Sequence, residues 1–400
     1  MMPTVFTIPF INRDVPGFGL MMMMGFLGAI WWAVRRAQKS GADPDVLLNC
    51  GFIALIAGVI GCRFMYVFAN WEQFASRGSA GQIVWAIVNV SGGGLEFYGG
   101  FILASLCVIF YLWRAGHSLR WYFDIIAPSA ALGLALGRIG CFLNGCCYGG
   151  TCDAPWAVRF PHGSSAQIVQ WQTYRAGADI PKQLTIVGPT GVPGQIPRED
   201  LGAGDERIEA AAKKEADLGA EIAKLDAEIK SVEGDAARTA ALRARRVRVD
   251  RKLTAASRRF GLIRYQMRKY DMTAAQIRAL AAQYRSLAVH PTQLYSSIAA
   301  LLIALILNAW YWRRTRDGQV ICLLFIIQPI TRWTLEVIRD DVPTATLGLF
   351  TRSQVLAVGL TVIGVAGMSI LRRLPARSPA ARIWEPPEDD PKTAAATAKS

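Results

Sequence analysis

Hydrophobic residues in this chain gather in long segments, separated by short polar connections and by one long hydrophilic stretch. A helix needs about 20 mostly apolar residues to cross a hydrocarbon core about 30 Å thick. Seven segments meet or approach that length, which predicts an all-α integral membrane protein with seven transmembrane helices. The predicted spans are residues 17–36, 46–70, 96–113, 122–142, 292–312, 319–338 and 354–371.

Basic residues in the connections predict the orientation of these spans. They gather in every second connection and in the C-terminal tail, and the opposite connections are poorer in them. Because cytoplasmic connections carry the excess of Lys and Arg, we expect the N-terminus outside and the C-terminus in the cytoplasm. The residues on the expected cytoplasmic side are Arg35, Arg36, Lys39, Arg114, Arg120, Arg313, Arg314, Arg316, Arg372, Arg373, Arg377 and Arg382.

The composition agrees with a membrane protein. Hydrophobic residues make up 52% and charged residues 18% of the chain, which is too apolar for an average soluble domain. The formal net charge of +14 lies partly in the cytoplasmic connections and partly in the hydrophilic stretch. We therefore expect no nucleic-acid partner.

The hydrophilic stretch divides the chain between the fourth and fifth spans. It opens with a Gly/Pro-rich part, including residues 188–197, that predicts loops or short strands. We expect four parts along the chain. They are a membrane domain with spans one to four and the start of an outer arm (1–164), an extracytoplasmic insertion (165–289), a membrane domain with spans five to seven (290–371) and a disordered cytoplasmic tail (372–400).

Two heptad stripes in the insertion predict an antiparallel helical hairpin. Glu215 is the one charged residue in the first stripe, and Gly234 and Asp235 separate the two stripes. The apolar positions are Ile208, Ala211, Leu218, Ile222, Leu225, Ile229 and Val232 in the first stripe, and Leu242, Val249, Leu253, Ala256, Phe260, Ile263 and Met267 in the second.

A third helix is expected from Asp271 or Thr273, which are natural N-caps, to about residue 287. The arginine-rich run 243–251 lies on the second heptad helix. It has two open interpretations, a solvated helix face or a contact with anionic lipid head groups.

The segment GRIGCFLNGCCYGG, residues 137–150, is the most informative motif. It places Arg138 at the end of an apolar span, where a guanidinium is costly unless it has a partner. Phosphate suits the planar fork of donors, Asn144 offers a donor and an acceptor, and Gly145 and Gly149 allow the backbone to turn against a head group. The motif indicates a site for a phosphorylated lipid; an arginine that only caps its helix or pairs internally is the alternative.

Two further polar clusters lie at the same predicted outer ends. In SGGGLEFYGG, two glycine clusters flank Tyr98, which suits either exposed amides at a site or tight helix packing. In HPTQLYSS, Pro291 fits the first turn of a helix and places His290 at the helix N-terminus. Gln293 and Tyr295 then project into the outer part of the span.

A fourth cluster, TRWTLEVIRDD, ends the sixth span. Arg332, Glu336 and Arg339 fall on one side of a helix. Burying such charges singly is expensive, so either an internal Arg332–Glu336 pair or an anionic ligand is expected. Because all four clusters reach one depth on one face, they predict a single site in the outer half of the membrane.

Four of the eight cysteines, Cys141, Cys146, Cys147 and Cys152, lie close together in sequence. They suit packing as small residues, a disulfide on an oxidising outer side, or a metal centre. The adjacent pair and the four-residue gaps match neither zinc-ribbon CxxC pairs nor ferredoxin spacing. The spacing therefore predicts no specific metal site, and packing, a disulfide and, least favoured, a metal centre stay open.

In this order, the clusters resemble the prolipoprotein diacylglyceryl transferase family. The resemblance covers residues 17–164 and 289–371 and rests on GRIG…NG…YG followed by HP-x-QLY, with WAVRFPHGS also similar. It implies transfer of an sn-1,2-diacylglyceryl group from phosphatidylglycerol to the lipobox cysteine thiol of a prolipoprotein, giving a thioether and glycerol 1-phosphate. It further implies a bacterial inner-membrane protein among membrane lipids, an active site toward the periplasm, and no metal or cofactor.

The resemblance also implies roles for residues. A thiolate must form, for which Tyr98 or His290 is the expected base, and the charge of the leaving phosphate needs Arg138 with Arg332 or Arg339. The expected catalytic residues are Tyr98, Arg138, His290 and Arg332, and the expected substrate-binding residues are Arg138, Asn144, Gly145, Gly149, Gln293, Tyr295, Glu336 and Arg339.

Departures from the family keep other functions open. Tyr98 stands where some members have histidine, Phe18 replaces a tyrosine, and Cys141 and Cys146 replace an asparagine and an acidic residue. A non-catalytic lipid-binding scaffold, an inactive member that recruits a partner, and a transporter are the alternatives. A transporter would favour internal repeats and polar residues at the midplane, and the two halves of this sequence show neither.

The insertion generates the first testable prediction. If the helical hairpin is autonomous, a fragment of residues 200–289 should show strong helical circular dichroism on its own. A coil spectrum would mean that the segment folds only against the membrane domain or a partner.

Overall fold

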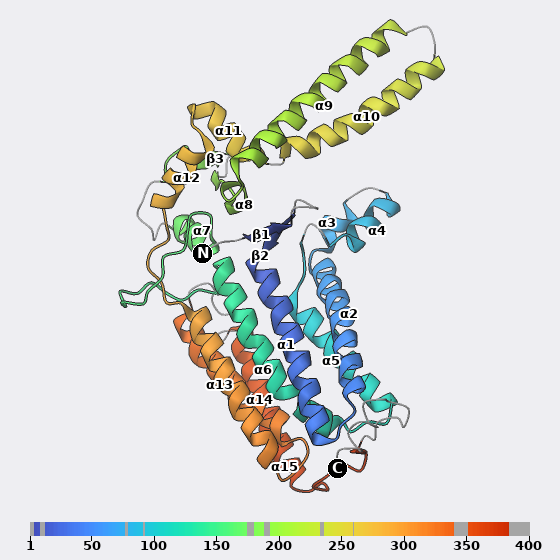
Figure 1. The fold of residues 1–400 in the computed structure, drawn as a ribbon, viewed down its shortest axis with the longest axis vertical. Helices are drawn as coiled ribbons and strands as arrows, with labels where there is room; N and C mark the ends of the chain where they lie inside the picture. The colour runs from blue at the N-terminus through green and yellow to red at the C-terminus, as the bar shows by residue number, and fades with distance from the viewer. Residues whose placement is uncertain are drawn as a thin grey trace, which may run out of the picture. The chain divides into compact units, whose positions relative to one another are not determined.

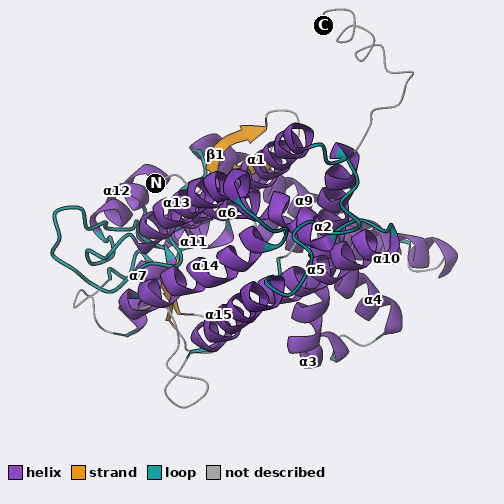
Figure 2. Cartoon of the chain, turned by 90° about the horizontal axis from the view of Figure 1, so that it is seen from below, coloured by secondary structure: helices purple, strands orange, loops and turns teal. Residues whose placement is uncertain are grey.

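A computed structural model describes residues 4–8, 13–76, 79–90, 93–173, 180–187, 193–232, 236–258, 260–339 and 351–383. Helices dominate these residues (Figures 1 and 2). The chain forms two compact units, which we call the bundle unit (residues 21–138, 295–337 and 343–400) and the insertion unit (residues 1–20, 139–294 and 338–342).

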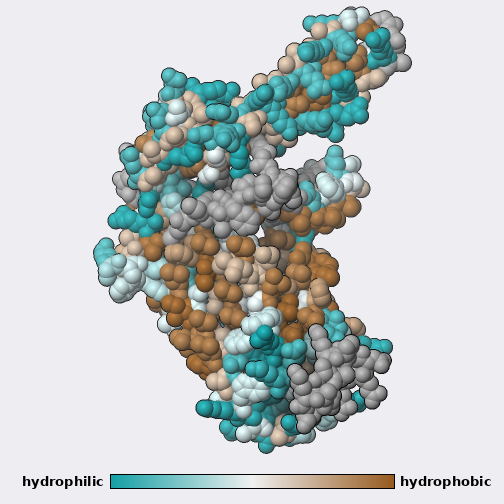
Figure 3. Space-filling view, in the orientation of Figure 1, coloured by the Kyte–Doolittle hydropathy of each residue, from teal (hydrophilic) through white to brown (hydrophobic). Residues whose placement is uncertain are grey.

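Within the described ranges, seven helices are long and apolar enough to cross a membrane. They match the seven predicted spans to within about one helical turn, so the predicted all-α membrane fold is confirmed. Figure 3 shows hydrophobic residues covering the visible face of these helices in the bundle unit. The helices are α1 (Gly17–Ser40), α2 (Pro44–Ala69), α5 (Phe97–Arg114), α6 (Leu119–Asn144), α13 (Thr292–Arg313), α14 (Gln319–Ile338) and α15 (Arg352–Leu371).

Several short elements were not predicted. The strands β1 (Thr4–Ile8) and β2 (Arg13–Pro16) form an antiparallel pair before α1, and α3 (Trp71–Ala75) and α4 (Ala80–Val88) connect α2 to α5. None of these segments is long enough to show a clear helical or alternating period, which explains why the pattern missed them.

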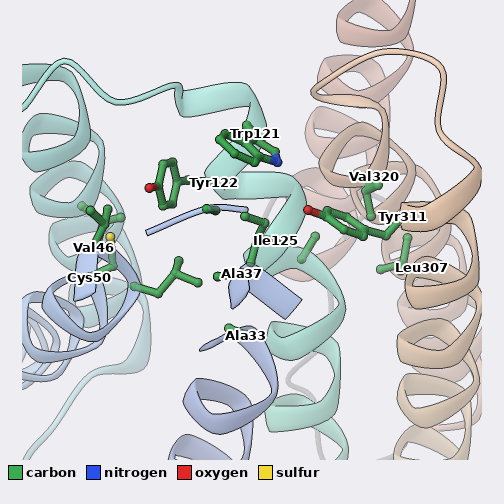
Figure 4. Packing of buried hydrophobic residues seen from close by; sticks show 14 of the residues in the cluster. Ala33, Ala37, Val46, Cys50, Trp121, Tyr122, Ile125, Leu307, Tyr311 and Val320 are labelled. Carbon is green, nitrogen blue, oxygen red and sulfur yellow. The ribbon is translucent and has the colours of Figure 1, made fainter. Parts of the chain in front are cut away.

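The core of the bundle unit lies where α1, α2, α5, α6, α13 and α14 meet, and Figure 4 shows part of it. Ala33 and Ala37 of α1 are small enough to let that helix approach Ile125 of α6. On the other side of α6, Tyr122 lies toward α2, while Tyr311 of α13 packs with the cluster near α14 (Figure 4). Small residues on α1 thus allow aromatic side chains of the neighbouring helices to fill the interior.

Arg36 differs from its expected place among the cytoplasmic anchors, because it is buried at 2% exposure. Its guanidinium donates to Asn308 Oδ1 at 2.8 Å, to the Ile125 carbonyl at 2.7 Å and to Ser129 Oγ at 3.0 Å. These acceptors replace water around the buried charge. Arg36 therefore ties α1 to α6 and α13.

The basic connections gather at one end of the bundle unit. Arg120 donates to the Pro375 carbonyl at 3.1 Å, Arg316 donates to the Leu374 carbonyl at 2.6 Å, and the Asp317 amide donates to the Ala376 carbonyl at 2.9 Å. The starts of α6 and α14 therefore meet the end of α15, as alternating spans require. Which side of a membrane this end faces stays a prediction.

A buried carboxylate binds the start of α14 at the same end of the bundle unit. Asp124 of α6, at 0% exposure, accepts hydrogen bonds from the amides of Gly318, Val320 and Ile321 at 2.7–3.0 Å. The Arg314 guanidinium lies 3.3 Å from it. The first amides of a helix lack intrahelical acceptors, so Asp124 caps α14 from a different helix.

In the insertion unit, α9 (Asp205–Ser231) and α10 (Ala236–Arg258) lie side by side (Figure 1). Arg245 pairs with Glu221 at 3.0 Å and Arg246 with Asp226 at 2.6 Å, and the Thr239 hydroxyl donates to the Val232 carbonyl. These contacts join residues before the turn to residues after it, as in an antiparallel pair of helices. The predicted hairpin is confirmed, while the predicted Gly234–Asp235 turn lies outside the described residues.

The second heptad helix is shorter than predicted. The stripe to Met267 is divided between α10 and α11 (Gly261–Tyr270), because Phe260 adopts a left-handed φ of 55°. Buried Arg264 of α11 donates to the carbonyls of Ala256 and Ser257 and pairs with Glu215. Partial desolvation raises the pKa of Glu215, but the hydrogen bond and the charge of Arg264 lower it, and the net effect is a lowered pKa. The pair with Arg264 thus accounts for a charged residue at this heptad position.

The remaining elements complete the insertion unit. Thr273 caps α12 (Ala274–Gln283) with a capping box, so the predicted third helix is confirmed but ends earlier than residue 287. The strands β3 (Thr185–Val187) and β4 (Pro193–Gln195) form the expected short antiparallel pair, and residues 188–192 lie outside the described part. Two short helices, α7 (Ser165–Gln172) and α8 (Arg198–Leu201), were not predicted.

The cap on α14 generates a prediction. Asp124→Ala should lower the free energy of unfolding by about 3–5 kcal/mol, because Arg314 and three amides lose a buried acceptor. Thermal unfolding of the purified protein in detergent measures the change. Asp45→Asn, at an exposed position in the first turn of α2, is the control and should change it by about 0.5 kcal/mol or less; equal midpoints would contradict the assignment.

Candidate functional site

The end of α6 turns sharply into what we call the signature loop, residues 145–150. Gly145 has φ 77°, and its amide donates to the Cys141 carbonyl at 2.9 Å, which closes the helix. Arg198 donates to the Asn144 carbonyl at 3.1 Å. A Cβ on Gly145 would lie 3.2 Å from Ser164 Cβ, so both the positive φ and the packing favour glycine.

The loop is hydrogen-bonded on two sides. The Gly149 amide donates to the His290 carbonyl at 3.0 Å, and the His290 amide donates to the Gly150 carbonyl at 3.0 Å. On the other side the Gly150 amide donates to the Ile338 carbonyl at 2.8 Å, and Gly149 forms a bridge with Arg339. The backbone therefore brings together three of the four predicted clusters.

Side chains at the start of α13 hold the middle of the loop. Thr292 Oγ1 donates to the Cys147 carbonyl at 2.8 Å, and Gln293 Nε2 donates to the Cys146 carbonyl at 2.7 Å. Gln293 is 1% exposed, and its Oε1 has no donor among the residues that the structure describes. The predicted binding residue Gln293 is thus a positioning residue for the loop that still has an acceptor to offer.

Arg138 lies on α6 in the bundle unit, half-buried and six residues before Asn144. Within the described ranges, no carboxylate pairs with its guanidinium. Of the two alternatives, an internal ion pair is therefore unsupported in the described residues, and a purely capping role for Arg138 stays open.

Arg332 and Glu336 of α14 form the internal ion pair that the sequence left open. Arg332 Nη2 lies 2.7 Å from Glu336 Oε2, and Glu336 is 6% exposed. Glu336 also accepts hydrogen bonds from Ser353 Oγ at 2.6 Å and Thr351 Oγ1 at 3.2 Å. The pair thus joins α14 to the start of α15, and Asp340 and Asp341 of the same cluster lie outside the described residues.

Tyr98 lies in the first turn of α5 and is exposed. The neighbouring glycines serve tight packing: a Cβ on Gly99 would meet Met65 and the Gly61 carbonyl, and one on Gly100 would meet Cys62. The packing interpretation of this glycine pair is therefore supported. Ser91 and Gly92 of the cluster lie outside the described residues.

Arg63 of α2 is a residue that the sequence reading missed. Its guanidinium donates to five carbonyls of the segment before α5, at 2.6–2.9 Å. An arginine within an apolar span was the available signal. Arg63 therefore holds in place the segment that leads directly to Tyr98. The five carbonyls belong to Ala86, Ile87, Asn89, Gly93 and Gly94.

The remaining polar candidates lie on α13 and in the insertion unit. Tyr295 is half-buried in the first turns of α13, and His290 precedes that helix as predicted. By contrast His162 is buried, and burial lowers its pKa to about 4, against a smaller opposing effect of the Tyr284 backbone. His162 is therefore a neutral core residue at pH 7.

The loop generates a prediction with a control one residue away. A Cβ on Gly149 would lie 2.7 Å from both His290 Cβ and Thr292 Cγ2, whereas one on Gly150 would lie 3.6 Å from its nearest neighbour. Gly149→Ala should therefore cost about 1–3 kcal/mol through overpacking, and Gly150→Ala much less. Thermal unfolding and amide exchange of residues 145–150 measure this; two variants that behave alike would contradict it.

Comparison with known proteins finds bacterial relatives that share one name. A phosphatidylglycerol–prolipoprotein diacylglyceryl transferase of Rhodopirellula baltica is 37% identical over 168 residues, 40% of this chain and 32% of that protein. One of Clostridium tetani is 28% identical over 42% of this chain and 63% of its own length. One of Pectobacterium atrosepticum is 37% identical over 39% of this chain and 55% of its own length. The chain thus spans less than two thirds of the length of each of these relatives.

The family profile reaches further than these pairwise matches. It covers residues 3–370, which include the seven apolar helices, the signature loop and the segments bonded to it. The chain therefore belongs to the prolipoprotein diacylglyceryl transferase family.

Proposed function

We propose that this protein transfers the sn-1,2-diacylglyceryl group of phosphatidylglycerol to the lipobox cysteine thiol of prolipoproteins. Family membership supports the reaction class, and the relatives' names supply both substrates. The observation that carries the proposal is the position of Arg138, half-buried on the apolar helix that runs into the signature loop. A charge there is costly without a partner, and a lipid phosphate can be that partner.

Three other arginines that lie away from the ends of apolar helices have protein partners, whereas no partner of Arg138 is found among the described residues. Arg36 and Arg63 donate to carbonyls and neutral side chains, and Arg332 pairs with Glu336. Arg138 is therefore the best candidate to bind the phosphate directly. Arg332 has a weaker claim, since a ligand must compete with Glu336, and Arg339 joins the loop through its backbone.

The chemistry requires one substitution at carbon. The lipobox thiolate attacks glyceryl C3, a carbon–sulfur bond forms, and the C3–oxygen bond breaks. The electron pair leaves with the phosphate oxygen as glycerol 1-phosphate, and the thiol proton passes to a base. Arg138 compensates the negative charge of the leaving phosphate, and Tyr98 and His290 are the proposed bases.

Gln293 supports binding of the glycerol part of the head group. Its buried Oε1 lacks a donor among the described residues, and a buried acceptor without a donor costs about 1–3 kcal/mol. A glycerol hydroxyl supplies such a donor. Asn144, Gly145, Gly149, Tyr295 and Glu336 remain proposed substrate-binding or supporting residues.

The proposed setting is the bacterial inner membrane, with the N-terminus outside and the C-terminus in the cytoplasm. The gathering of basic connections at one end of the bundle unit supports this orientation. The site then faces the periplasmic half, and residues 165–289 form an extracytoplasmic insertion between the two parts of the membrane domain, followed after residue 371 by a cytoplasmic tail.

The test uses purified protein, phosphatidylglycerol labelled in its acyl chains and a lipobox peptide with one cysteine. Label should reach the peptide but not its Cys→Ser version. Arg138→Ala should reduce transfer by about 10²–10³-fold, as loss of one preorganised charge-stabilising group does. Arg120→Ala, at the other end of α6, is the matched control and should keep transfer near normal.

Two results would contradict this assignment. Near-normal transfer by Arg138→Ala would remove Arg138 from the site. Absence of transfer by the unaltered protein, with lipid binding retained, would favour a non-catalytic lipid-binding scaffold.

A further inference from the structure

Three cysteines converge at the end of α6, in the insertion unit. The Sγ atoms of Cys141, Cys146 and Cys147 all lie within 4.8 Å of one another, and each residue is half-buried. No role in the proposed transfer requires these thiols.

The backbone around the three thiols is fixed from several directions. Cys141 lies in the last turn of α6, and the Gly145 turn brings Cys146 back so that its amide donates to the Cys141 carbonyl at 3.2 Å. Cys147 has a left-handed φ of 59°, and side chains of α13 hold the carbonyls of both Cys146 and Cys147. The sulfur atoms therefore converge without help from a ligand.

The distances suit a metal ion better than a sulfur–sulfur bond. Zn–S bonds of about 2.3 Å place the sulfurs of a trigonal or tetrahedral site about 3.8–4.0 Å apart. Sulfurs within 4.8 Å reach that separation by small side-chain rotations, whereas a disulfide requires about 2.05 Å and joins only two of the three.

The surroundings offer a hydrogen-bond donor to one of the sulfurs. Asn144 Nδ2 lies 3.5 Å from Cys146 Sγ and can donate to the thiolate that a metal requires.

We propose that Cys141, Cys146 and Cys147 form a three-thiolate site for one thiophilic d¹⁰ cation of the Zn²⁺ class, with one coordination position left to solvent or a further ligand. Binding displaces three thiol protons, because only thiolates ligate. The sequence spacing matched no zinc motif because the helix end and the Gly145 turn, rather than CxxC pairs, bring the sulfurs together. A bound metal would tie the end of α6 to the signature loop.

The test uses the reduced full-length protein in detergent and Cd²⁺ as the probe, since thiolate–Cd²⁺ bonds absorb in the ultraviolet. We expect saturation at one equivalent, displacement by Zn²⁺, and release of protons. Cys141→Ser, Cys146→Ser and Cys147→Ser should each weaken binding by more than about tenfold. Cys107→Ser, at a single thiol on α5 in the bundle unit, is the control and should bind as the unaltered protein does.

Three results would overturn the site. They are absorption that does not saturate, absorption that persists when all three cysteines are serine, and a disulfide from Cys141 to Cys146 or Cys147 in protein isolated without reductant. Matching thermal unfolding of the serine variants and the unaltered protein without metal shows that folding is not the cause of lost binding. None of these readouts depends on transferase activity, so they are independent of the proposed function.

Discussion

Two backbone amides, those of Gly149 and Gly150, set the position of the signature loop. One donates to the carbonyl of His290 and the other to that of Ile338, at 3.0 and 2.8 Å. Because backbone groups supply these bonds, the loop resembles the middle strand of a small irregular sheet, and its place does not depend on flexible side chains. Only a residue without Cβ fits at Gly149, so the close approach and the hydrogen bonds require each other. Gln293 and Thr292 then fix the carbonyls of Cys146 and Cys147.

Several charged groups inside the apolar helices have a structural role. Asp124 caps α14, Arg36 joins α1 to α6 and α13, and Arg63 holds the segment before α5. Backbone groups or neutral side chains replace water around Arg36 and Arg63, and backbone amides together with Arg314 do so around Asp124. An ionisable residue in a span is therefore insufficient to locate a site, and the decisive question is whether the protein already supplies its partners. The protein supplies partners to Asp124, Arg36 and Arg63, and among the described residues it supplies no carboxylate to Arg138.

The seven spans could be predicted because crossing a membrane imposes a length and an apolar composition that a single sequence shows directly. The meeting of the signature loop with His290 and with Ile338 and Arg339 was also predictable, because the motifs that contain these residues lie at the same predicted outer ends of their spans. The break at Phe260 was not, since a left-handed backbone and the Arg264–Glu215 pair depend on tertiary contacts. Nor could the sequence show that Gln293 binds a backbone carbonyl of the loop, because that depends on the register between two distant segments.

The ends of the helical segment in the insertion unit are joined at its base. Val158 pairs with Val289, Phe160 with Ser286, and Gln170 accepts from the Leu287 amide at 2.8 Å. The two ends of the intervening segment are thus held next to each other by these hydrogen bonds. Lengthening such a segment costs little, about 0.6 kcal/mol of closure entropy for each doubling. The length of this segment can therefore change between proteins at little cost in stability, and the same two chain ends suit the grafting of a reporter domain.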